Sequence, residues 1–349
     1  MPATRTTIAL FCAAALISAV APSAPHRAHA ADMSALYEAA KKEGALNLFG
    51  GGPAALYTGR ATKFEQRFPG IKVNVVGGFS NRLTKQIDDA RKAGKPVADL
   101  ALLQTVQDFV KWKKDGVLAP FKPDDWDKIS DRFKDPDGHF LGHYVVMIAY
   151  AHRPDLANVP IRAANDFLNP AFRGKLISTY PHDDDATLYH YTRLVDRYGW
   201  SFMDEYMKLE PKWVMGHLGV AQALDKGEAA GSIDQITAMN KGSSVVIPAD
   251  EPVTVFPQTL AIFRDAPHPN AARLYVNWYM GKEEASTVPA AGRWSTRTDI
   301  APPKGFQPLS AYKLNDDFTR FMTEDPAKIE ALRARFKAYT GEVKGPEVR

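Results

Sequence analysis

Cysteine is almost missing from this sequence. Of its 349 residues only Cys12 is a cysteine, and it lies in the apolar stretch near the start of the chain. The remainder of the chain therefore offers no thiol for a disulfide, a thiolate metal site or nucleophilic catalysis. A hydrophobic core has to supply its stability, and a chain of this length can bury one.

Long apolar runs are also missing beyond the first thirty residues, so no segment resembles a membrane-spanning helix. Near the N-terminus, Arg5 precedes an apolar run over residues 8–20, and small residues stand at Ala28 and Ala30. This arrangement is typical of a secretory signal peptide, which we expect to cover residues 1–30 and to be cleaved after Ala30. The sequence thus predicts an exported protein without direct membrane insertion.

An excess of one charge is not present either. The chain has 44 Lys and Arg against 40 Asp and Glu, and removal of Arg5 and Arg27 with the signal leaves 42 against 40. A nearly neutral chain without a long run of one sign argues against nucleic acid as a partner. The roughly 320 residues after the signal predict two domains, at about 150 residues each.

Motifs that mark cofactors or catalysis are missing as well. The sequence has no G-x-x-x-x-G-K-[ST], no G-x-G-x-x-G, no G-x-S-x-G and no H-E-x-x-H. We therefore expect no cofactor, no metal site and no catalytic residue. Catalysis by a pair of carboxylates leaves no such motif, so an exported hydrolase of that kind stays open as an alternative.

Strand and helix patterns alternate along the chain. Short apolar runs at 45–50, 71–76 and 98–103 are each followed by a helical pattern, which predicts a mostly parallel sheet flanked by helices. A long apolar strand at 139–152 can carry the chain out of this lobe, and another at 253–263 can carry it back.

The segment between these crossing strands predicts a second α/β lobe, also built on a mostly parallel sheet, while helices at 270–280, 316–321 and 326–339 close the chain. We assign residues 31–145 plus 258–349 to a discontinuous first lobe and 146–257 to the second. Ligands of open α/β sheets bind where strands end, so we expect a cleft between the lobes.

Polar and glycine residues follow the predicted strands at this edge. In the first lobe a glycine turn and two pairs of short polar side chains could face a ligand, although each could also be a turn or a helix cap. These residues are Gly51, Gly52, Ser80, Asn81, Gln104 and Thr105.

The second lobe offers acids and aromatic residues at the same kind of position. Three aspartates, Asp183, Asp184 and Asp185, open a helix, where one would suffice as a cap, so some could grip a cation, an amine or hydroxyls. The other candidates follow the strands nearby or lie on that helix, and Arg293 in a later loop could bind a carboxylate. These further residues are Tyr180, Thr187, Asp234, Gln235 and Arg293.

Several local patterns resemble the solute-binding proteins of importers with an ATP-binding cassette (ABC), in the family 1 branch that includes ferric-ion-binding proteins. The similarity rests on LYEAAKKEGALNLFGG, FEQRFPGIKVNVVGG, PVADLALL, DFLNPAFRGKLISTYP and FPQTLAIFRDAPHPNAARLYVNWYMGKE, in that order. It implies a type II two-lobe fold, a periplasmic location, no catalysis, a small-molecule ligand, a permease as partner and lobes that close by a hinge. It also places the loop of Arg293 near the cleft.

One departure from that branch concerns metal. Its iron-binding members usually carry adjacent tyrosines, whereas this chain reads Tyr189-His190-Tyr191 in the matching region. Separated phenolates form a weaker site for a hard trivalent ion. The sequence therefore favours another small solute, with ferric ion as the alternative.

Overall fold

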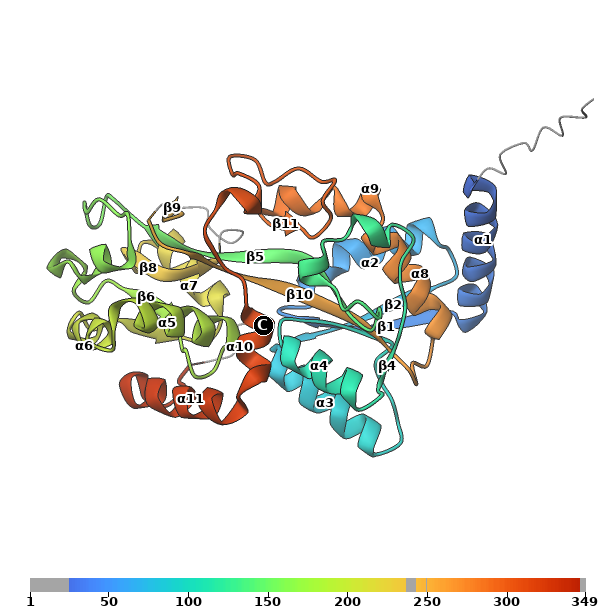
Figure 1. Cartoon of the computed structure of the whole chain (residues 1–349), viewed down its shortest axis with the longest axis horizontal. Coiled ribbons are helices and arrows are strands. Elements are labelled where there is room, and N and C mark those ends of the chain that lie inside the picture. Colours follow the sequence, from blue (N-terminus) through green and yellow to red (C-terminus); the bar gives the residue numbers. More distant parts are fainter. Residues whose placement is uncertain (1–24, 237–242, 249, 346–349) are drawn as a thin grey trace, which may run out of the picture.

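The structure is a computed structural model that describes residues 25–236, 243–248 and 250–345. Figure 1 shows two lobes side by side, joined by long strands, with α1 (Pro25–Glu43) at one end. Residues 1–24 of the predicted signal peptide lie outside the described part. Helix α1 runs through the position after Ala30, and cleavage there stays a prediction. In the described chain no helix is long and apolar enough to cross a membrane.

The first lobe is built on a parallel sheet with helices on both faces. Its strands follow the order β3-β1-β2, with Phe49 paired to Val76 on one side and Ala101 on the other. Successive side chains of a strand point to opposite faces. Leu48 therefore packs with the helices α2 and α8, while Phe49 packs with α3 and α4. The elements are β1 (Ala45–Gly51), α2 (Ala55–Arg67), β2 (Lys72–Gly78), α3 (Ser80–Lys92), β3 (Leu100–Leu103), α4 (Val106–Lys114), β4 (Leu118–Ala119), α8 (Pro269–Met280) and α9 (Lys282–Ala285).

Two long antiparallel strands connect the lobes. Every residue of β5 (Leu141–His152) and of β10 (Val253–Phe263) is buried, which explains their apolar runs without alternation. β10 pairs with β3 of the first lobe, and its register against β5 shifts between Gln258 and Thr259. The crossing strands expected from the sequence are thus present, and they make one continuous sheet across both lobes.

The second lobe is more mixed than the sequence predicts. In the described part of this lobe, β6 (Ile177–Thr179) pairs in parallel with β7 (Lys212–Val214), and a single parallel bridge joins Leu176 to Gly231. In contrast, β8 (Gly231–Ile236) and β9 (Ser244–Val246) pair antiparallel with β5. The expectation of a mostly parallel sheet fails in this lobe because the long β5 offers its free edge to these strands. The helices of this lobe are α5 (Asp185–Tyr198), α6 (Ser201–Lys208) and α7 (His217–Lys226).

The sequence pattern also predicts a helix over residues 164–172, but the structure has two short 3₁₀ turns there, η3 (Ala164–Leu168) and η4 (Pro170–Phe172). Asn169 lies between them with an extended backbone (φ −64°, ψ 132°), because a residue before proline is disfavoured in the helical region. Its side-chain oxygen accepts a hydrogen bond from the N–H of Ala171 and starts the second turn.

The C-terminal helices lie beside the second lobe (Figure 1). Phe321 of α10 (Phe318–Glu324) and Phe336 of α11 (Pro326–Thr340) share a hydrophobic cluster with Tyr189 and Tyr191 of α5. The predicted boundaries place these helices with the first lobe. In the structure both helices contact α5 of the second lobe, and α10 also contacts α4 of the first lobe. Helical periodicity reveals an apolar side but not the lobe that covers it. The remaining boundaries stay a prediction.

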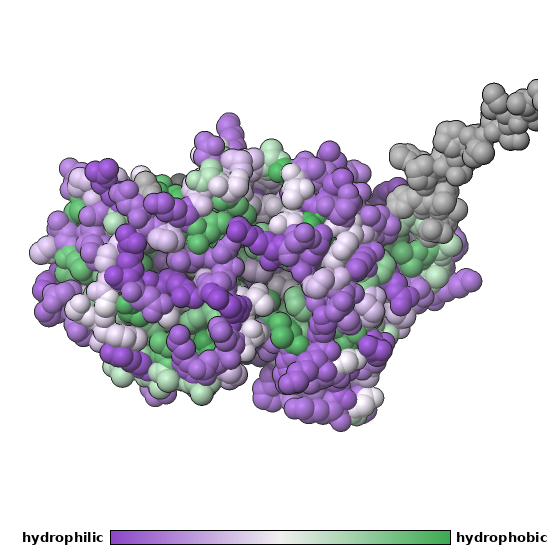
Figure 2. Space-filling view, viewed as in Figure 1, coloured by the Kyte–Doolittle hydropathy of each residue, from purple (hydrophilic) through white to green (hydrophobic). Residues whose placement is uncertain are grey.

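Short elements complete the chain, and the face of the surface seen in Figure 2 is hydrophilic. The face shown in Figure 2 is mainly polar, and Leu56 and Val97 are the large hydrophobic residues with exposed side chains among those described. The short elements are η1 (Trp126–Lys128), η2 (Asp131–Phe133), η6 (Val288–Ala291), β11 (Trp294–Ser295), η7 (Leu309–Ala311) and β12 (Leu314–Asn315).

The end of β2 approaches the glycine turn after β1 so closely that it tolerates only glycine. A Cβ on Gly77 would lie 2.3 Å from the backbone nitrogen of Ala54, whereas a Cβ on Gly59 inside α2 would meet nothing within 4 Å. We expect Gly77→Ala to lower the free energy of unfolding by about 1–3 kcal/mol through overpacking. Gly59→Ala should raise it by about 0.5–1 kcal/mol through helix propensity.

Urea unfolding of both variants measures these changes. Equal stability of Gly77→Ala and the wild type would contradict the close approach of these two segments.

Candidate functional site

A cleft of about 620 Å³ lies between the lobes. The first lobe contributes the turns after β1 and β2, the second contributes the starts of α5 and α7, and the crossing strands form the base. Its polar lining consists of Ser80, Arg82, Gln86, Gln104, Asp184, His217, Gln258 and Arg293, and its apolar or glycine lining includes Gly51, Gly52, Leu56, Gly77, Gly78, Phe79, Tyr144, Met215, Gly216, Leu218 and Ile236.

The turn after β1 forms the base of the cleft on the first-lobe side. A Cβ on Gly51 would lie 2.6 Å from Oγ of Ser80 and 3.1 Å from Nε2 of Gln258, so a larger residue there would displace these two side chains. The hydroxyl of Tyr57 donates a hydrogen bond to the carbonyl of Gly51, at 2.6 Å. Gln258 in turn donates to the carbonyl of Leu102, at 2.9 Å. The backbone of the turn is thus held at the surface of the cleft.

Helices from both lobes begin at this cleft without a side-chain cap. The capping positions of α2, α3 and α7 are Ala54, Phe79 and Gly216, and none of them accepts a hydrogen bond through its side chain. All of these residues line the cleft. The first N–H groups of a helix carry a partial positive charge, so these ends favour an anion.

Helix α5 also begins at the cleft, but its end is capped. Oδ1 of Asp184 accepts hydrogen bonds from the N–H groups of Ala186 and Thr187, at 2.9 and 3.0 Å. Its Oδ2 accepts from Nε2 of Gln104 at 3.0 Å, across the cleft. Asp184 is the one carboxylate in the described lining, and both of its oxygens are already engaged.

Arg293 supplies a positive charge at the crossing strands. Its Cζ atom lies 4.4 Å above the ring of Tyr144, which is a cation–π contact. Its Nε atom is buried and has no hydrogen-bond partner among the residues described. The guanidinium therefore keeps donors for a ligand in the cleft.

The lobes touch each other at the rim. Besides Gln104 and Asp184, Nε2 of Gln107 donates to Oδ2 of Asp185 at 2.5 Å. A Cβ on Gly216 would lie 3.1 Å from the ring of Phe79, so the start of α7 packs against the start of α3. These contacts join elements of different lobes without a covalent link.

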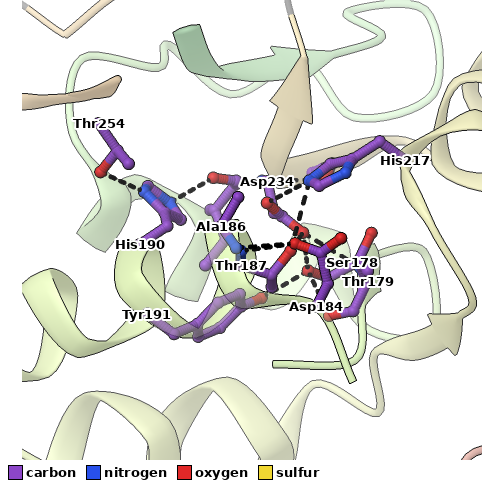
Figure 3. A network of polar contacts seen from close by, with 12 residues as sticks. Ser178, Thr179, Asp184, Ala186, Thr187, His190, Tyr191, His217, Asp234 and Thr254 are labelled. Atoms are coloured by element: carbon purple, nitrogen blue, oxygen red, sulfur yellow. Dashed lines mark hydrogen bonds and ion pairs between the residues drawn. The ribbon is translucent and has the colours of Figure 1, made fainter. Parts of the chain in front are cut away.

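A buried polar network supports the wall of the second lobe (Figure 3). Nε2 of His217 lies 3.1 Å from Oδ1 of Asp234 and 3.3 Å from Oγ1 of Thr187. Oδ2 of Asp234 accepts from the hydroxyls of Ser178 and Thr187 and from the N–H of Thr179, each at 3.2 Å. Asp234 is fully buried, and His217 is 6% exposed, at the cleft.

Burial and the attraction between the two side chains shift the pKa values of His217 and Asp234 in opposite directions. Burial alone would lower the pKa of His217, but the charge of Asp234 and the hydrogen bond to it outweigh burial and raise this pKa to about 9. Burial would raise the pKa of Asp234, yet His217 and the other donors hold it below its ordinary value. The pair is therefore an imidazolium with a carboxylate at neutral pH.

The structure distributes the predicted site residues over several places. Those that line the cleft are Gly51, Gly52, Ser80, Gln104, Asp184 and Arg293. Thr187 and Asp234 are buried behind the cleft wall and hold His217. Contact of these residues with a solute stays a prediction.

The remaining candidates lie away from the lining. Asn81 is exposed on α3. The others are buried: Thr105 beside Thr84, Tyr180 beneath the C-terminal segment, Asp185 in an ion pair with Arg333, and Gln235 in β8. Alternation along a strand or helix turns neighbours such as Thr105 and Asp185 away from the side that faces the cleft.

His217, Arg82 and Gln258 are lining residues that sequence reasoning missed. For His217 a signal was present, because Gly216-His217 follows a predicted strand just as Gly51-Gly52 follows β1. The residue pattern predicts a helix only over residues 220–226, because Gly216 and Gly219 weaken the pattern before it, whereas α7 begins at His217.

Outside the cleft, one group of side chains has the spacing of a metal site. Asp135, Asp137 and His139 bring their ligand atoms within 4.8 Å of one another. However, Nζ of Lys113 lies 2.5 Å from Asp135 and 2.7 Å from Asp137. An ammonium already fills the position between these carboxylates, so this group is a surface ion-pair cluster.

Known structures share this fold at low sequence identity. Iron-bound HitA from Pseudomonas aeruginosa superposes with a TM-score of 0.68 at 16% identity, covering 84% of this chain and 99% of that one. AfuA from Actinobacillus pleuropneumoniae with fructose-6-phosphate bound gives 0.70 at 16%, covering 84% and 98%. The substrate-binding protein of an ABC transporter from Agrobacterium tumefaciens gives 0.71 at 15%, covering 85% and 94%. These likenesses concern the fold, which is the two-lobe fold of periplasmic binding proteins.

The sequence itself also matches a family. A search of curated proteins finds no significant match. The family model described as bacterial extracellular solute-binding protein matches residues 46–293, which include both crossing strands and every lining residue of the cleft. The chain belongs to the bacterial extracellular solute-binding protein family.

Proposed function

We propose that this protein captures a small organic anion in the periplasm and delivers it to the permease of an ABC importer. The observation that carries this proposal is the convergence of the uncapped ends of α2, α3 and α7 on one cleft beside Arg293. Helix ends without caps leave N–H groups that need an acceptor, and an anion satisfies several at once. The membership in a solute-binding family agrees with this role.

The size and walls of the cleft support an organic rather than a bare inorganic anion. A volume of about 620 Å³ falls within the range of roughly 300–1,000 Å³ that is common for small-molecule sites. Apolar side chains from both lobes, including Leu56, Phe79, Leu218 and Ile236, line much of it. We expect these walls to cover the carbon skeleton of the solute.

Ferric ion is less well supported as the ligand. Tyr189 and Tyr191 are fully buried and donate hydrogen bonds to Asp317 and Ser178, while His190 bonds Thr254 and the carbonyl of Ile233. None of these side chains lines the cleft. Among the proteins of similar fold, HitA holds iron and AfuA holds fructose-6-phosphate. A sugar phosphate agrees better than iron with the uncapped helix ends of this cleft.

Catalysis by a carboxylate pair is also less well supported than binding. General acid and base work needs two such groups on either side of a substrate. In the described lining Asp184 stands alone, and its oxygens are occupied by α5 and Gln104. We therefore propose a receptor rather than a hydrolase.

Replacement of Arg293 tests the anion site. Arg293→Met keeps the length of the side chain but removes its charge, and we expect the affinity for an anionic solute to fall about 10- to 100-fold, because a charge-assisted hydrogen bond contributes about 1.5–3 kcal/mol. Thermal shift and calorimetry with organic acids, phosphorylated sugars and their neutral parents measure the change.

Arg335→Met is the matched control, since Arg335 also lies over an aromatic ring, that of Trp200, but on α11 and outside the cleft. An equal loss in both variants, or a ligand that binds Arg293→Met as tightly as the wild type, would contradict the anion site.

Hinge closure is the second testable part of the proposal. β5 and β10 are the strands that cross between the lobes, so a small twist of these strands can close the cleft around a solute. Closure should be driven by contacts that the solute makes with both lobes at once. We expect small-angle scattering to show a smaller radius of gyration for the saturated than for the solute-free protein. Identical curves at saturation would argue against closure.

A further inference from the structure

One cationic group in the cleft belongs to the second lobe. Arg293 and Arg82 reach the cleft from the side of the first lobe and the crossing strands, whereas His217 is the first residue of α7. Met215, Gly216 and Leu218 next to it also line the cleft, so the whole start of this helix faces the ligand space.

The ring of His217 is held in one orientation by groups behind it. Asp234 and Thr187 both contact Nε2, at 3.1 and 3.3 Å. Nδ1 has no hydrogen-bond partner among the described residues, although the side chain is only 4% exposed. A ring anchored through one nitrogen therefore offers the other as a donor at the uncapped end of α7.

We infer that His217, positioned by Asp234, is the anion-binding group of the second lobe and that the preferred solutes carry two negative charges, as phosphate monoesters and dicarboxylates do. This inference rests on the proposed function, since it concerns the same cleft. Positive groups on both lobes let a doubly charged solute hold the lobes together. Asp234 balances the charge of the ring, so the ring acts on a solute as a charge-assisted N–H donor. A singly charged solute can satisfy the donors of only one lobe in full.

The acidic side chains near this ring are engaged with other groups and leave the free nitrogen of the ring available for a ligand. The titratable groups that face it are Asp234 on β8 and Asp184 and His190 on α5. Asp234 is engaged with Ser178, Thr179 and Thr187 as well as with the ring. Asp184 caps α5, and burial keeps the pKa of His190 below its ordinary value, so that ring is neutral.

The charge of the ring should persist over the pH range in which such solutes are doubly charged. The pKa of His217, about 9, exceeds its ordinary value of 6.5 because Asp234 outweighs burial. Above about pH 7 a phosphate monoester has lost its second proton. Affinity for it should therefore stay level from about pH 7 to 8.5 and fall as the pH rises through about 9.

The experiment compares matched probes by calorimetry. Phenyl phosphate carries two charges and methyl phenyl phosphate one, while homophthalate and phenylacetate form the corresponding carboxylate pair. We expect the wild type to bind at least one dianion about tenfold or more tightly than its monoanionic partner. Which pair shows the preference distinguishes a phosphate monoester from a dicarboxylate.

Variants of His217 and Asp234 test whether the ring of His217 causes the preference for doubly charged probes. His217→Gln should lose most of the preference for two charges, and Asp234→Asn should lose it near neutral pH because burial then lowers the pKa of the ring. His182→Gln is the matched control, since His182 belongs to the same lobe, bonds Thr340 and does not line the cleft. Should Asp234→Asn not fold, an NMR titration of His217 in the wild type, with and without the bound dianion, gives the same information.

An unchanged preference in His217→Gln overturns the inference, as does a wild type that binds no charged probe or binds both members of each pair equally. A neutral solute that binds and closes the lobes would overturn the inference and leave the receptor function intact. Failure of every solute to bind or to close the lobes would instead overturn the proposed function itself.

Discussion

The pairing of β5 with β10 is the constraint on which the rest of the molecule depends. Both strands are buried along their whole length, and each lobe attaches its own strands to them: β3 to β10, and β8, β9 and β11 to β5. Burial on both faces requires apolar side chains at successive positions, which is what the two segments contain. Because the lobes share this sheet, the ends of their helices meet at one cleft.

The unpaired N–H groups at the helix starts either bind a side-chain cap, which stabilises the lobe, or stay available for a solute. Asp184 satisfies the first N–H groups of α5 and so stabilises the lobe by itself. At α2, α3 and α7 the capping residue has no side chain able to do this. A protein gives up some helix stability at such ends, and a bound anion can restore it. Capping is thus complete where the cleft wall is structural and incomplete where a solute is expected.

The network around Asp234 places a protonated ring at the cleft wall of the second lobe. A fully buried carboxylate is costly unless it is paired and hydrogen-bonded, and here the hydroxyls, one N–H and the ring of His217 supply those partners. The pair also keeps the ring protonated at the cleft. Stability and ligand binding therefore depend on the same few atoms.

The sequence by itself determined the strands, most helices and the order in which the chain leaves and re-enters the first lobe, since periodicity and glycine turns are local signals. It also predicted that residues after strands, such as Gly51, Ser80, Gln104 and Asp184, gather at one edge, because parallel strands end together. Only the tertiary structure decided that α10 and α11 pack against α5, that β8 pairs antiparallel with β5, and that His217 rather than Asp234 faces the cleft. These outcomes depend on contacts between segments far apart in the chain and on the burial of charge. The local pattern of residues predicts neither of them.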